Sequence, residues 1–149
     1  MGEVPQAIQQ TKPRKDIVFL AYILIVLCVL NIIVGVALIF IAIFLPNDRY
    51  VIPHILQWTF ALLAFCFPWF GIVGAWKCLL PALICFDIYL VFQFVWNVLQ
   101  IIGVSMAGAV VNLAVQIIFA AFEIILAVAM FIVTTAMCVM LVNYYRMQE

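Results

Sequence analysis

The chain has 149 residues and no net charge; 71% of its residues are hydrophobic and only 8% are charged, and its mean hydropathy is +1.39. Soluble domains carry about 25% charged residues, so this composition excludes a water-soluble globular protein and identifies the lipid bilayer as the medium. The polar stretches are too short for a soluble catalytic domain, a nucleotide site or a nucleic-acid-binding surface.

Four apolar runs follow a polar N-terminal tail at 1–16. A membrane-spanning helix needs about 20 apolar residues, and the runs that reach this length are 17–45, 54–76, 79–103 and 109–145. A turn-rich loop with two prolines separates the first pair, small residues separate the last pair, and a short tail follows at 146–149. The sequence therefore predicts an all-α, polytopic membrane protein with one four-helix transmembrane domain at 17–145 and short loops.

Basic residues indicate the orientation of this bundle. Only Arg49 lies on one side; the others, all on the opposite side, are Lys12, Arg14, Lys15, Lys77 and Arg146. Basic segments are retained on the cytosolic side of a membrane. We therefore predict that both termini are cytosolic and that Lys77 anchors a tight cytosolic turn.

Small residues share one helical face in the first two spans. Such faces let helix backbones approach each other closely within a membrane. We therefore predict helix packing at Gly35, Ala61, Ala64, Pro68, Gly71 and Ala75.

Polar side chains also cluster on helical faces. Within a membrane, such side chains typically form hydrogen bonds between helices. The predicted intramembrane contacts are Asn31, Gln93, Asn97, Gln100, Gln116 and Glu123. One interpretation is a self-contained bundle held together by these faces. The alternative is a polar pathway, for which proton relays use several ionisable groups in succession.

Asp87 lies off the polar face of its own span. It follows Lys77 by ten residues, which places it about 15 Å into the membrane. A carboxyl group that faces lipid costs at least about 2.5 kcal/mol. Three roles remain open for Asp87: a contact within the bundle, a contact with a partner protein, and the handling of protons or ions.

Five cysteines are scattered without metal-ligand spacing, and the chain has one histidine. The sequence therefore predicts no metal, no cofactor and no catalytic residues, and buried free thiols account for most of the cysteines. Cys78 differs because it lies at a membrane edge beside Lys77, where reversible S-palmitoylation occurs. We predict Cys78 as a candidate palmitoylation site.

Two motifs resemble a known family. Gly74-Ala75-Trp76-Lys77 ends the second span, Cys85-Phe86-Asp87-Ile88-Tyr89 lies in the third, and Val142-Asn143-Tyr144-Tyr145-Arg146 closes the chain. This pattern resembles the lysosome-associated four-span transmembrane proteins and the related arthropod pasiflora-like proteins of septate junctions. The long outer loop and the proline-tyrosine tail of the lysosomal members are missing. A weaker similarity links the first two spans to tetraspanins, whose large outer loop is absent.

The predicted function is that of a non-enzymatic membrane protein that packs laterally against others. It would act as a scaffold, a junction or trafficking component, or an accessory subunit. The alternatives are a small channel or transporter and a supernumerary subunit of an energy-transducing complex. The expected partners are the bilayer and other integral membrane proteins, including homo- or hetero-oligomers, without nucleic acid. The expected location is the plasma membrane or an endomembrane rather than a mitochondrial membrane.

Overall fold

The computed structural model describes residues 15–44, 54–106 and 110–147, except for the side chains of 41–42, 44, 54–58, 104–106 and 110–116. This part of the chain is helical apart from short turns. Its helices are α1 (Lys15–Phe44), α2 (His54–Cys66), α3 (Pro68–Lys77), α4 (Leu80–Met106) and α5 (Val110–Arg146). Four stretches are long and apolar enough to cross a membrane: Lys15–Phe40, Thr59–Lys77, Leu80–Gly103 and Ile117–Arg146. The predicted all-α, four-span architecture is confirmed.

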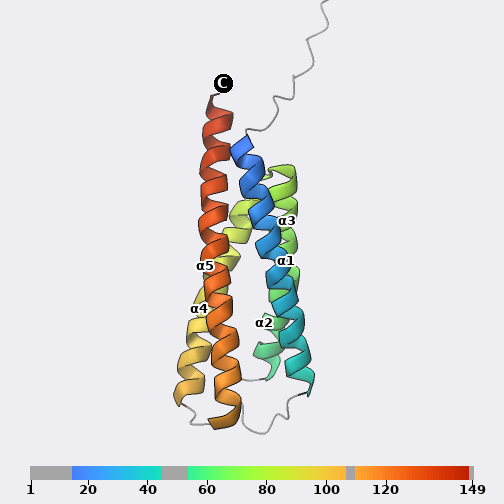
Figure 1. Cartoon of the computed structure of the whole chain (residues 1–149), viewed down its shortest axis with the longest axis vertical. Coiled ribbons are helices and arrows are strands. Elements are labelled where there is room, and N and C mark those ends of the chain that lie inside the picture. The colour runs from blue at the N-terminus through green and yellow to red at the C-terminus, as the bar shows by residue number, and fades with distance from the viewer. Residues whose placement is uncertain (1–14, 45–53, 107–109, 148–149) are drawn as a thin grey trace, which may run out of the picture.

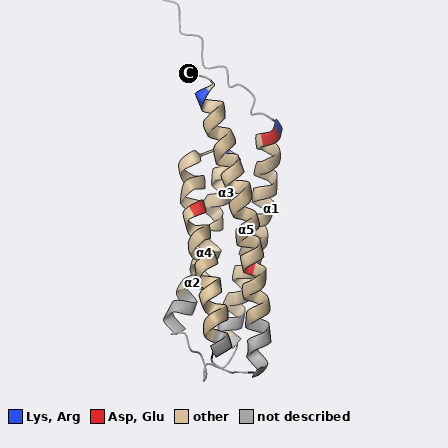
Figure 2. Cartoon of the chain, turned by 90° about the vertical axis from the view of Figure 1, so that its left-hand side faces the viewer, with Lys and Arg blue, Asp and Glu red and all other residues tan. Residues whose placement is uncertain are grey.

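The helices form a bundle in which each span contacts two main neighbours (Figure 1). α5 packs between α1 and α4, and α3 packs between α1 and α4 on the other side. α1 begins and α5 ends at the same end of the bundle, and the described Lys and Arg residues lie there (Figure 2). We call this the charged end; its basic residues are Lys15, Lys77 and Arg146. The cytosolic orientation of this end stays a prediction. Of the basic residues on which it rests, Lys12, Arg14 and Arg49 lie outside the described residues.

The second span, predicted as a single run at 54–76, consists of the two helices α2 and α3. Proline has no N–H group, so Pro68 cannot continue the hydrogen-bonding pattern to the carbonyl of Ala64. The chain closes the break with bonds from Phe67 N to Leu63 O and from Phe70 N to Phe67 O, both 2.9 Å long. Gly35 of α1 packs directly against this break: a Cβ there would lie 3.3 Å from both the carbonyl carbon and the oxygen of Ala64.

A two-residue turn joins α3 to α4. Cys78 adopts the left-handed conformation with φ 51° and ψ 40°, and the N–H of Leu79 donates to the carbonyl of Gly74 at 2.9 Å. This is the hydrogen bond of a Schellman cap, which usually has glycine at the left-handed position. The left-handed conformation of Cys78, a residue with a side chain, therefore destabilises the turn by about 1–2 kcal/mol relative to glycine.

The size and polarity of the side chains that fill the bundle interior change along its length. Near the charged end it is filled by large apolar side chains with almost no exposure, among them Ile17, Leu24, Leu83, Phe86 and Met137. Towards the other end it contains small and polar residues. The polar part of the interior holds the candidate site.

Candidate functional site

Four buried polar side chains meet between α1, α4 and α5. Asn31 of α1 and Asn97 of α4 are 0% exposed, Gln93 is 4% exposed, and Glu123 of α5 is 5% exposed. The Nε2 of Gln93 donates to the Oδ1 of Asn31 at 3.2 Å. The side chains of Asn97 and Gln93 also lie near the Glu123 carboxyl group, although the Nδ2 of Asn97 makes no hydrogen bond. We call these four residues the buried polar cluster.

Helical spacing explains how the chain assembles the cluster. Gln93 and Asn97 are four residues apart on α4, so they occupy one face and lie above each other. Asn31 precedes Gly35 by the same interval on α1, and the close approach of Gly35 to α2 holds that part of α1 inside the bundle. The cluster thus lies where small residues bring helices together.

Several atoms of the cluster have no hydrogen-bond partner among the described residues. They are Asn31 Nδ2, Gln93 Oε1, Asn97 Nδ2, Asn97 Oδ1 and Glu123 Oε1. A buried polar group without a partner costs about 1–3 kcal/mol, so further hydrogen bonds would stabilise this arrangement. These unpartnered atoms include both hydrogen-bond donors and acceptors, a combination that could bind a small neutral molecule such as water. A metal ion suits it less, because amide NH₂ groups repel cations, and the described residues contain no group of three His, Cys, Asp or Glu that could hold one.

The cluster is separated from the charged end by an apolar layer. Above it, Thr134 is buried but uses its hydroxyl to donate to the backbone carbonyl of Met130 at 2.7 Å. Phe86, Met130 and Met137 are each 0% exposed and fill the interior at and beyond this level. Apolar side chains thus separate the buried polar cluster from the charged end.

Asp87 does not belong to the cluster. Its Oδ2 accepts a hydrogen bond from the Oγ1 of Thr135 on α5 at 3.4 Å, and its Oδ1 is buried without a partner among the described residues. Asp87 is half-buried and Thr135 is exposed, so this pair lies on the outer surface of the seam between α4 and α5. The structure thus supplies Asp87 with a contact inside its own chain, although a long one for two oxygen atoms.

The other residues predicted to form intramembrane or packing contacts differ in how far they are buried in the bundle. Gln100 is half-buried at the far end of α4, and the side chain of Gln116 lies outside the described residues. The six residues predicted for helix packing are all buried: Gly35, Ala61, Ala64, Pro68, Gly71 and Ala75. Gly71 is the most constrained, since a Cβ there would lie 2.8 Å from both the Sγ of Cys28 and the Cε1 of Phe86.

Two contacts were missed in the sequence analysis. Thr135 was not considered, although Thr134 and Thr135 form a polar break in the apolar fourth span. Phe60 and Trp96 stack with centroids 3.7 Å apart and planes inclined by 7°, which joins α2 to α4. No spacing rule connects these two aromatic residues, because they lie on different helices.

Cys78 lies between two spans rather than within one. Its Sγ donates weakly to the carbonyl of Ala75 at 3.9 Å. Burial raises the pKa of the Cys78 thiol, so less of the nucleophilic thiolate is present at neutral pH. S-palmitoylation of Cys78 stays a prediction, and its thiol is less reactive in this fold than a fully exposed one.

Comparison of the chain with protein-family models, with curated proteins and with solved structures finds no match. The architecture therefore defines the class, a four-span integral membrane protein, and the comparisons identify no family within it.

Proposed function

We propose that this protein is a non-enzymatic membrane component that assembles laterally with another integral membrane protein, as a scaffold, a junction or trafficking component, or an accessory subunit. The observation that carries this proposal is the Asp87–Thr135 pair on the outer surface of the α4–α5 seam. A carboxyl group in the spanning region is costly, and a single hydrogen bond of 3.4 Å to a hydroxyl offsets little of that cost. Because Oδ1 is buried inside the chain, a neighbouring membrane helix would have to donate to Oδ2, beside Thr135, and such a bond would offset more of the cost.

The surroundings of the pair suit a contact between helices. One turn to either side of Asp87 on α4 lie the exposed residues Ile84 and Val91, and one turn to either side of Thr135 on α5 lie Phe131 and Val139. The polar pair is thus framed by apolar side chains. Membrane helices associate through close packing around a few interhelical hydrogen bonds, which is the pattern that this surface offers.

The apolar layer supports lateral assembly over conduction. A channel or transporter needs polar groups along its route, whereas the interior near the charged end is filled by residues such as Leu24, Phe86 and Met137. The buried polar cluster therefore serves, in this proposal, to fix the register of α1, α4 and α5. The resemblance of the second and third spans to four-span lysosomal and junction proteins also supports a role in trafficking or junctions.

The test compares two variants of Asp87 in native purification. The tagged full chain is extracted from its own membranes in mild detergent, and the yield of co-purifying membrane proteins is measured together with the stability of the isolated chain. Asp87→Leu should weaken the association by about 0.6–2 kcal/mol, roughly threefold to thirtyfold, whereas Asp87→Asn should retain it because the amide still forms hydrogen bonds.

Gln93→Leu, on the same helix but in the buried polar cluster, is the matched control, because it removes the hydrogen bond to Asn31. It should lower the stability of the isolated chain, while Asp87→Leu should leave that stability nearly unchanged. A chain that purifies alone, or an Asp87→Leu variant with wild-type partner yield, would refute the proposed contact.

A further inference from the structure

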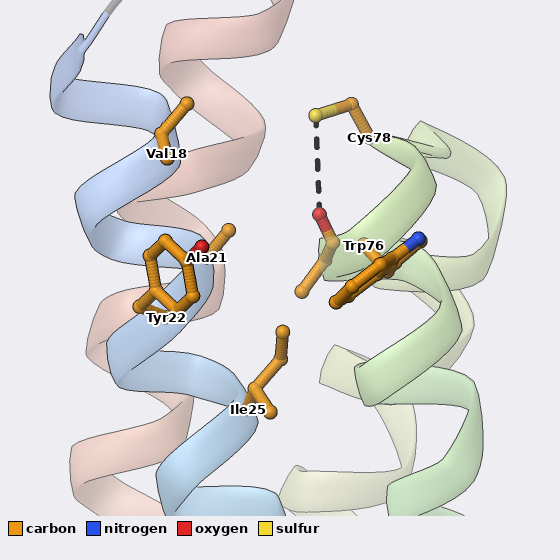
Figure 3. Close-up of a pocket in the computed structure, with 7 residues that line it drawn as sticks. Val18, Ala21, Tyr22, Ile25, Trp76 and Cys78 are labelled. Atoms are coloured by element: carbon orange, nitrogen blue, oxygen red, sulfur yellow. Dashed lines mark hydrogen bonds between the residues drawn. The ribbon is translucent and has the colours of Figure 1, made fainter.

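A groove of about 200 Å³ opens between α1 and α3 near the charged end (Figure 3). The residues that line it are Val18, Ala21, Tyr22, Ile25, Ala75, Trp76 and Cys78. None of them is charged, and most are purely apolar. In a membrane-spanning bundle such a groove faces the bilayer, so the available molecules are lipids, other helices and acyl chains attached to the protein.

Two lysines of the charged end lie close in the chain to residues that line this groove. Lys15 begins α1 one turn before Val18, and Lys77 stands between Trp76 and Cys78; both lysines are exposed. The first turn of α1 also presents the positive end of a helix dipole. Asp16 is the one acidic residue in that turn, so the mouth of the groove keeps a net positive charge that complements a phosphate group.

Two aromatic residues define the walls of the groove. Tyr22 of α1 and Trp76 of α3 lie on opposite sides of it, with Ala21 and Ile25 between them (Figure 3). They are 64% and 73% exposed, although both are large. Tyrosine and tryptophan favour the headgroup level of a bilayer, where the ring is apolar and the polar atom can form hydrogen bonds. The two rings therefore mark the depth at which an acyl chain joins its headgroup.

We propose that this groove binds one anionic phospholipid of the leaflet at the charged end, with part of an acyl chain between Tyr22 and Trp76 and the phosphate beside Lys15 and Lys77. The apolar lining selects the acyl chain, and the two lysines select an anionic headgroup over a zwitterionic one. The site lies across α1 and α3, away from the α4–α5 seam, and does not depend on the lateral assembly proposed above.

The test measures lipid binding to the purified full chain by native mass spectrometry. Phosphatidylserine and phosphatidylcholine with identical acyl chains are titrated separately, and the fraction of protein with one bound lipid is followed. Phosphatidylserine should bind more tightly. Lys15→Gln and Lys77→Gln should each weaken its binding about fivefold and leave phosphatidylcholine nearly unaffected, since each basic residue near an anionic headgroup contributes about that factor.

Arg146→Gln is the matched control, because it removes a cation at the same end of the bundle but on α5. It should leave phosphatidylserine binding unchanged. Ala21→Phe fills the groove and should weaken the binding of both lipids. Because Ala21 is buried and a larger side chain there can disturb folding, Val18→Trp at a more exposed position on the wall is the second variant, and the melting temperature of each is measured without lipid.

Several results would overturn the proposal. Equal affinity for the two lipids, or a loss in Arg146→Gln as large as in the lysine variants, would show that the groove selects no anionic headgroup. Unchanged binding in both folded groove variants would place the lipid elsewhere. A mass increase that hydroxylamine removes and Cys78→Ser abolishes would identify a thioester-linked acyl chain as the occupant, and a dimer that forms as lipid dissociates would identify a second copy.

Discussion

Replacing Gly71 with alanine, which adds a single methyl group, should destabilise this bundle. A Cβ there would lie 2.8 Å from Cys28 Sγ on α1 and 2.8 Å from Phe86 Cε1 on α4. Carbon atoms in contact prefer about 3.5–4.0 Å, so each neighbour would have to move by roughly 0.7 Å or more. Cys28 and Phe86 are both 0% exposed, so neither can move without displacing neighbouring side chains. Overpacking of this kind costs about 1–3 kcal/mol.

Gly103 supplies the control for this prediction. It also lies within a helix, α4, but a Cβ there would meet nothing within 4 Å. Gly→Ala in a helix gains up to about 1 kcal/mol from propensity at either site, so the difference between the variants isolates the overpacking. Unfolding of Gly71→Ala and Gly103→Ala by denaturant in the same detergent should give free energies about 1–3 kcal/mol apart. Equal stabilities would refute the close packing of α3 between α1 and α4.

Three further predictions concern the turn, the buried polar cluster and the topology. Cys78→Gly should stabilise the chain by about 1 kcal/mol in thermal unfolding, because glycine adopts the left-handed conformation without penalty; a Cys78→Gly variant no more stable than Cys78→Ala would contradict the strain. Asn31→Leu should cost about 1–3 kcal/mol because it removes the acceptor of Gln93; in a double-mutant cycle with Gln93→Leu, strictly additive losses would contradict the hydrogen bond. An impermeant thiol reagent applied to intact cells should label Asn47→Cys but not Gln9→Cys, and the reverse pattern would overturn the predicted orientation.

The number of spans follows from the sequence because burial in lipid requires long apolar runs, and such runs have few alternatives to a helix. The small residues were predicted to pack on the same reasoning. A Cβ at Gly71 would lie 2.8 Å from atoms of α1 and α4, and one at Gly35 would lie 3.3 Å from α2.

Contacts between side chains of different helices could not be predicted from the periodicity of any single helix. The position of Asp87 off the face of Gln93 and Asn97 indicated a separate contact, but the identity of that contact depends on the rotation of α5, which brings Thr135 to it. The division of the second span likewise needs more than hydropathy. Pro68 was assigned to helix packing from its position on the small-residue face, while its effect on the backbone separates α2 from α3.

The central claim, lateral assembly through the α4–α5 seam, is tested most directly by photo-crosslinking in intact native membranes. A photoreactive residue at Val139, one turn from Thr135 and exposed, is compared with one at Val26, equally exposed on α1 across the bundle from α4. We predict a discrete protein adduct of one mass from position 139, none from position 26, and loss of that adduct in Asp87→Leu. Lipid adducts alone at position 139, or the same protein adducts from both positions, would contradict the claim.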